Sequence, residues 1–135
     1  MRKLLPVSRL SLKRLRIGLL GLALQLLWLP VVRAASPTNT QMEVDFLLGY
    51  LAVSGCEFYR NGTWYNSDAA QAHLRKKYTY LAALNMVKSA DDFIEKAGSE
   101  SSFSGKAYQV RCNGGDTVTS RKWLNDELAH FRSRQ

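Results

Sequence analysis

Two polar residues, His73 and Lys77, lie one helical turn apart in a predicted helix. On a helical projection both fall among apolar side chains, whereas Arg75 and Lys76 point the other way. An imidazole and an ammonium in such a position need hydrogen-bonding partners or access to water, because burying an unpaired charge is costly. Two interpretations remain open. Either Lys77 extends its amine to solvent and His73 bonds a loop carbonyl, or both line a polar pocket.

A serine-rich loop, residues 99–105, is the second candidate for a binding site. In the pocket hypothesis this loop and the helix both contribute, so the candidate binding residues are His73, Lys77, Tyr78, Ser101, Ser102, Ser104, Gly105, Lys106 and Tyr108. The spacing of Ser104, Gly105 and Tyr108 is similar to the Ser-Gly-x-x-Tyr motif of periplasmic lysozyme inhibitors, in which a serine-bearing loop enters the enzyme's cleft. The alternative is that the hydroxyls bond loop amides and that Gly105 permits a turn.

An enzyme would have to use Ser104 as a nucleophile, with Lys106 or His73 as the base. The chain has no Gly-x-Ser-x-Gly elbow, and position 103 is Phe, so the loop offers no Ser-x-x-Lys motif. We therefore expect no catalytic site and no cofactor, and a small serine hydrolase is kept only as an alternative.

The amino-terminal segment has the three parts of a secretory signal peptide. Six of the first 16 residues are basic, the apolar stretch covers 17–29, and Val32 and Ala34 form a small-residue cleavage site. A membrane-spanning helix needs about 20 apolar residues, so a lasting anchor is not expected. The sequence predicts export to the periplasm, cleavage after Ala34 and only transient membrane contact.

Charge is concentrated in that segment. The whole chain of 135 residues has a formal net charge of +8, but 12 basic and 11 acidic residues remain after residue 34. Nucleic-acid affinity depends mainly on neutralising phosphates. Because the chain after residue 34 is nearly neutral, a nucleic-acid partner is not expected.

Two cysteines, Cys56 and Cys112, lie in the part expected to be exported. In an oxidising compartment they would form one disulfide. Free thiols, or a metal site shared with His73 or His130, are the alternatives. Because neither Cys-x-x-Cys nor His-x-x-x-His spacing is present, we expect no metal.

These residues must be positioned by a series of short elements. A polar lead (35–39) precedes a single domain (40–135), which begins with a helix over 41–54 whose capping box joins Thr40 and Glu43 and which stops at Gly55. Asn61-Gly62 predicts a hairpin between residues 57–60 and 63–65. The later elements are a helix from Asn66 or Ser67 to about Lys88, a short helix over 90–98, a strand over 107–112, a turn over 113–116 and a last helix capped by Ser120.

The fold class that this order predicts is α+β, with elements α-β-β-α-α-β-α, a short antiparallel sheet and one disulfide. The first helix is unusual because its apolar side chains cover an arc of roughly 220°, wider than the stripe of a surface helix. It is therefore either deeply buried or in contact with a partner. Self-association through the flank that carries Phe46 and Tyr50 is one such contact.

Several spaced residues resemble the YfeK-like family of small exported bacterial proteins, whose function is uncharacterised. The matching residues are Cys56-x-Phe58, Arg60-Asn61-Gly62, His73-Leu74-x-x-Lys77-Tyr78, Phe93-Ile94-Glu95-Lys96, Ser101-Ser102-x-Ser104-Gly105-Lys106-x-Tyr108-x-Val110-x-Cys112 and Trp123-Leu124. The resemblance implies a periplasmic protein but brings no activity or catalytic residue. We expect a non-catalytic binding or interaction protein of the cell envelope, whose partner is an unknown protein or a small polar ligand. The alternatives are a lysozyme inhibitor and a small serine hydrolase.

Overall fold

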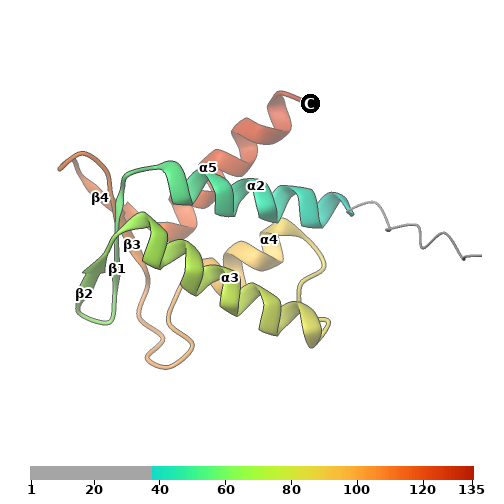
Figure 1. The fold of residues 1–135 in the computed structure, drawn as a ribbon, viewed down its shortest axis with the longest axis horizontal. Helices are drawn as coiled ribbons and strands as arrows, with labels where there is room; N and C mark the ends of the chain where they lie inside the picture. Colours follow the sequence, from blue (N-terminus) through green and yellow to red (C-terminus); the bar gives the residue numbers. More distant parts are fainter. Residues whose placement is uncertain (1–37) are drawn as a thin grey trace, which may run out of the picture. The chain divides into compact units, whose positions relative to one another are not determined.

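A computed structural model describes residues 38–135, so the expected signal peptide, its cleavage after Ala34 and most of the polar lead lie outside the described residues. The part of the chain that is described forms an α+β domain (Figure 1). Its elements are α2 (Asn39–Val53), β1 (Glu57–Arg60), β2 (Thr63–Tyr65), α3 (Ser67–Ala83), α4 (Ala90–Phe93), η3 (Ile94–Gly98), β3 (Gln109–Arg111), β4 (Thr117–Thr119) and α5 (Ser120–Ser133). The predicted fold class is confirmed.

The sheet has the strand order β2-β1-β3-β4, and every neighbouring pair is antiparallel. The hairpin forms as predicted, with both turn residues at positive φ, 49° at Asn61 and 93° at Gly62. The prediction missed β4. Its three residues, Thr117–Thr119, lie between a turn and a helix, and so short a segment shows no clear period of its own.

One face of the sheet packs against the helices, and its register places Phe58 opposite Val110 on that buried face. Figure 1 shows α2, α3 and α5 extending from this side of the sheet. The core is completed by apolar side chains from every helix, among them Leu47, Leu74, Phe93, Ile94 and Leu128. The position of β1 in this layer, with its end beside α3, is what builds the candidate site.

The start of α2 differs from the prediction by two residues. The N-cap of α2 is Thr38, whose hydroxyl accepts from the amide of Gln41 at 3.2 Å, rather than Thr40. The Thr40 hydroxyl instead donates to the carbonyl of Lys88 at 2.9 Å. The carboxylate predicted to complete the capping box, Glu43, is buried and pairs with Arg132 at 2.7 and 2.9 Å. A local pattern was therefore overridden by a contact between α2 and α5.

The three other predicted helices also differ in detail from the structure. Helix α3 ends at Ala83 rather than near Lys88, because Asn85 has a φ of 59°, which no α-helix can continue. The last helix was predicted to be capped by Ser120, but Ser120 is its first residue and the N-cap is Thr119, which is also the last residue of β4. The short helix predicted over 90–98 is present, but its second half is the π-helical η3.

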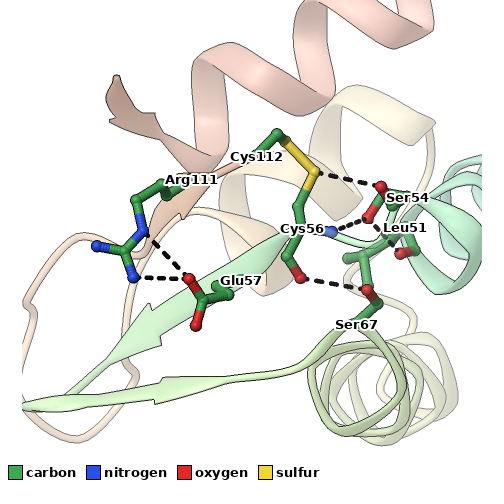
Figure 2. Close-up of a disulfide and its surroundings, with 7 residues drawn as sticks. All are labelled: Leu51, Ser54, Cys56, Glu57, Ser67, Arg111 and Cys112. Carbon is green, nitrogen blue, oxygen red and sulfur yellow. Dashed lines mark hydrogen bonds and ion pairs between the residues drawn. A yellow bond between two sulfur atoms is a disulfide. The ribbon is translucent and has the colours of Figure 1, made fainter. Parts of the chain in front are cut away.

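The disulfide between Cys56 and Cys112 is present and joins the start of β1 to the end of β3 (Figure 2). On one side, the Ser67 hydroxyl donates to the carbonyl of Cys56 at 3.2 Å and thereby attaches α3. On the other side, Arg111 donates to the carboxylate of Glu57 at 2.6 Å. These two residues are paired across β1 and β3, next to the two cysteines. The bridge therefore reinforces the pairing of the two central strands.

The wide apolar arc of α2 is explained within the chain. Its centre, with Leu47 and Leu48, is fully buried, and its flank contacts α5. The Phe46 ring stacks on that of Phe131, with centroids 4.1 Å apart, and the centroids of Tyr50 and Trp123 are 4.9 Å apart. The flank that was predicted to meet a partner is thus partly covered by the same chain, and self-association there stays a prediction.

Within residues 38–135 no helix combines the length and apolar character needed to cross a membrane.

Candidate functional site

Three separate segments line an open pocket of about 450 Å³. The end of β1 and the hairpin turn form one wall, α3 forms the second, and the loop between η3 and β3, here called the 99–108 loop, forms the third. The lining residues are Arg60, Asn61, His73, Lys77, Ser101, Ser102, Phe103 and Tyr108. These residues are separated by up to 48 positions in the sequence, so only the fold brings them together.

Two side chains of α3 hold this helix against the 99–108 loop. The Nε2 atom of His73 is 3.1 Å from the hydroxyl of Tyr108, a hydrogen bond whose direction depends on the imidazole tautomer. The Lys77 ammonium donates to the carbonyl of Glu100 at 2.9 Å and lies 5.2 Å from the centre of the Tyr108 ring. Both polar side chains on the apolar side of α3 are therefore provided with partners at the pocket wall.

The hairpin turn is tied to the same loop by a side-chain clamp. The Asn61 amide donates to the Ser101 hydroxyl at 3.0 Å, and the Ser104 hydroxyl donates to the Asn61 amide oxygen at 2.6 Å. The Ser101 oxygen also accepts from the amides of Phe103 and Ser104, both at 3.3 Å. These two hydroxyls therefore fix the shape of the loop.

The loop backbone is closed on itself as well. The Ser101 amide donates to the carbonyl of Lys106 at 3.0 Å, and the amide of Gly105, at a φ of 66°, donates to the carbonyl of Ser101 at 2.8 Å. At the base of the loop, the Ser99 hydroxyl donates to the carbonyl of Ile94 at 2.6 Å, which closes the π-helical turn. The walls of the pocket are thus held by hydrogen bonds on every side.

Burial, together with the positive charges at the pocket, shifts the pKa values of its groups. Burial, reinforced by the positive charges of Arg60 and Lys77, lowers the pKa of His73 to about 4. Burial also lowers the pKa of Lys77, an effect that the Glu100 carboxylate opposes. The pKa of Tyr108 is raised by burial. At neutral pH the site therefore presents a neutral imidazole and a protonated phenol.

The two cations of the pocket are not paired with carboxylates among the described residues. Arg60 lies over the Tyr65 ring, 4.7 Å from its centre, and takes part in no ion pair within residues 38–135. Lys77 has a backbone carbonyl as its hydrogen-bond partner. No carboxylate residue lines the pocket. Donors therefore outnumber charged acceptors at this site.

A small, mainly apolar recess of about 30 Å³ adjoins the pocket and shares Arg60, His73 and Tyr108 with it. Its remaining walls come from β1, β2, α3 and the start of α5: Phe58, Tyr59, Tyr65, Ala69, Ala70, Leu74 and Ser120. The site thus combines a cationic opening with an apolar floor.

The structure brings together five of the predicted site residues: His73, Lys77, Ser101, Ser102 and Tyr108. It does not place Tyr78 in the pocket, because its ring packs edge-on against the buried Phe93 at 5.7 Å. Ser104 supports the wall through Asn61, while Gly105 and Lys106 are exposed beyond the lining. The helical spacing that suggested Tyr78 could not distinguish the two edges of the apolar side of α3.

Three lining residues were missed: Arg60, Asn61 and Phe103. Strand alternation could have indicated Arg60, because it lies two residues after the inward-facing Phe58 and so shares its side of the sheet. Asn61 was assigned only to the turn. Phe103 projects from the loop with 96% of its surface exposed, and no sequence period marks such a position.

The serine hydroxyls and the His73 imidazole have separate hydrogen-bond partners. Within residues 38–135, the Ser101 and Ser104 hydroxyls bond Asn61 and backbone amides, whereas His73 bonds Tyr108. Nucleophilic catalysis needs the hydroxyl beside its base. In the described residues no group of three or more His, Cys, Asp or Glu side chains has the arrangement of a metal site.

The chain belongs to a family of unknown function, DUF5329, whose sequence model matches residues 38–132. The match covers all four strands and nearly all of α5, and therefore includes the whole pocket. No curated protein and no solved structure gives a match.

Proposed function

We propose that this protein is a non-catalytic binding protein of the bacterial cell envelope, which takes a small polar ligand into the pocket between β1, α3 and the 99–108 loop. The observation that carries the proposal is the convergence of His73, Lys77 and the serine-rich loop on one concave surface. A ligand site is expected where a concave surface combines apolar walls with a few polar groups of shifted pKa.

Export is the second part of the proposal. It is supported by the basic and apolar segments before Ala34, by the resemblance to the exported YfeK-like proteins and by the disulfide, which is typical of oxidising compartments. Expression of the full chain in a bacterial host tests it. We expect a periplasmic product whose first residue is Ala35; a product that keeps Met1 and stays in the cytoplasm would contradict export.

Binding is tested on the isotope-labelled protein recovered from that host, to which the small-molecule fraction of a periplasmic extract is added. We expect amide chemical-shift changes confined to residues 60–61, 73–77 and 99–103. In the double variant His73→Ala, Lys77→Ala we expect these changes to disappear while the spectrum stays that of a folded protein.

The matched control is the double variant Arg75→Ala, Lys76→Ala, which removes cations from the exposed side of α3 and should leave binding unchanged. Changes elsewhere, or none, would overturn the pocket as a binding site. So would a His73→Ala, Lys77→Ala variant that melts at a lower temperature but binds like the wild type, because both residues would then serve packing.

Lysozyme inhibition is the second candidate, and one observation favours it. Residues 102–107 are all exposed, and Phe103 is the most exposed large apolar side chain described. A projecting loop suits insertion into an enzyme cleft. If a large molar excess of the protein leaves lysozyme activity unchanged, this candidate is excluded; inhibition that is lost on Phe103→Ser would support it.

A serine hydrolase is the third candidate, and its test is direct. Labelling of Ser104 by a fluorophosphonate probe would overturn the proposal of a non-catalytic protein. We expect no labelling, because Ser104 donates its hydroxyl hydrogen to the amide oxygen of Asn61, which is not a base.

A further inference from the structure

We infer that the ligand of this pocket is a small aliphatic carboxylate, either a free organic acid or the terminal carboxylate of a peptide. This inference rests on the proposed function and names the class of its ligand. It is argued from the charges, the free donors and the apolar recess.

The charge at the pocket matches a monoanion. Arg60 and Lys77 line it as cations, and the carboxylate that acts on Lys77 through its charge, Glu100, offsets one of them. Lys76 adds a weaker positive field from the exposed side of α3. His73 adds no charge at neutral pH, because it is buried beside these cations. About one positive charge is left for the ligand to neutralise.

The free donors suit a planar carboxylate. The guanidinium of Arg60 rests on the Tyr65 ring and forms no hydrogen bond to a described residue, so its fork of N–H groups is open to an anion. The Lys77 ammonium uses one of its three N–H groups on the carbonyl of Glu100. Arg60 can therefore bind both oxygens of a carboxylate while Lys77 bonds one of them.

The recess specifies the rest of the ligand. It shares the side chains of Arg60, His73 and Tyr108 with the pocket, and its other walls are mainly apolar. A volume of about 30 Å³ accommodates a small apolar group such as a methyl or ethyl. A carboxylate that carries a methyl or ethyl group can therefore place its charge at the cations and its carbon end on the apolar floor.

The experiment uses the protein recovered from the bacterial host and five probes: propionate, propionamide, inorganic phosphate, and a tripeptide ending in alanine as its acid and as its amide. We expect propionate or the tripeptide acid to bind and the two amides not to bind. The tighter of the two acids identifies the source, a free acid or a peptide end. Phosphate that binds more tightly than both acids would overturn the assignment.

Two variants test the residues. Arg60→Gln and Lys77→Met should each weaken the affinity for the carboxylate by about tenfold, because each removes a charge-assisted hydrogen bond. Arg75→Gln and Lys76→Met remove the same charges from the exposed side of α3 and should change the affinity by less than about twofold. Equal losses in both pairs would show non-specific attraction and would overturn the inference.

A second readout is independent of affinity. A bound carboxylate offsets the positive field of Arg60 and Lys77, so saturation with the binding acid should raise the pKa of His73. An unchanged value would contradict binding beside His73. If the periplasmic fraction perturbs the pocket and none of the carboxylates does, this inference fails and the proposed function stands; if neither perturbs it, both fail.

Discussion

At the scale of single residues, His73 shows how the pocket changes the chemistry of a side chain. Its imidazole is half-buried beside Arg60 and Lys77, and its Nε2 bonds the Tyr108 hydroxyl. Burial and the two cations both favour the neutral form. His73 is therefore a neutral hydrogen-bonding group near pH 7 and not a cation of the site.

We predict that the His73 ring titrates near pH 4 in the folded protein. The unfolded chain has the ordinary value of about 6.5, so it binds the proton more readily between these two values. The stability that neutral His73 contributes is present above about pH 6.5 and is lost as the pH falls towards 4. Carbon-bound imidazole proton shifts followed by NMR measure the titration.

The variant His73→Gln assigns the resonance and serves as the control, because it keeps polar atoms but does not titrate. Its unfolding free energy should depend less steeply on pH between about 4 and 6.5 than that of the wild type. A His73 midpoint at or above 6.5 would show that the imidazole is solvated and would contradict its burial beside the two cations.

At the scale of elements, the π-helical η3 determines where the 99–108 loop begins. It follows α4 directly and ends at Gly98, which lies against α5. A Cβ atom at Gly98 would be 2.6 Å from Cδ1 of Leu124, a fully buried side chain. The close approach of η3 and α5 therefore disfavours a side chain at position 98, and it positions Ser99 and Glu100 opposite α3.

We predict that Gly98→Ala lowers the free energy of unfolding by about 1–3 kcal/mol, because the added methyl overpacks the contact with Leu124. Gly49→Ala is the matched control, since Gly49 is exposed in α2 and nothing lies within 4 Å of its added Cβ. That control should gain about 0.5–1 kcal/mol from helix propensity. Urea denaturation measures both, and a neutral or stabilising Gly98→Ala would contradict the tight contact.

At the scale of the whole described domain, one covalent bond connects strands that are distant in the sequence. Cys56 and Cys112 are 56 residues apart, and the loop that they close contains β1, β2, α3, α4, η3 and β3. Every wall of the pocket lies within this loop. The disulfide therefore restricts the unfolded form of the part of the chain that builds the site.

We predict that the double variant Cys56→Ala, Cys112→Ala loses roughly 4 kcal/mol of unfolding free energy, as the chain-entropy estimate gives for a loop of this length. Native domains are stable by only about 5–15 kcal/mol, so the loss is a large share. Reduction of the wild type should lower its free energy of unfolding by a similar amount. A loss below about 1 kcal/mol would show that the sheet alone maintains the pairing of β1 and β3.

Much of the fold could be predicted because its signals are local. Asn61-Gly62 tolerates the positive φ of a tight hairpin, and Gly55 provides the end of α2. The parts that could not be predicted depend on distant partners. Glu43 fits a capping box by spacing, but in the fold its carboxylate is bound by Arg132, 89 residues away.

The candidate site divides in the same way. The sequence indicated His73 and Lys77 because polar residues on an apolar helix side violate the expected pattern, and it indicated the serine-rich loop by composition. It could not show that Arg60 completes the pocket or that Tyr78 belongs to the core. Those assignments depend on the contacts of β1 and η3 with α3.

The sequence by itself determined the α+β class, the hairpin, the order of the predicted elements and the pair of cysteines available for a disulfide. Backbone preferences and hydrophobic periodicity act over a few residues, so they can be deduced from the chain. Only the tertiary structure decided that α3, the hairpin turn and the 99–108 loop enclose one electropositive pocket. That outcome depends on packing and on hydrogen bonds between residues about 20 to 50 positions apart, such as Lys77 with Glu100 and Asn61 with Ser101.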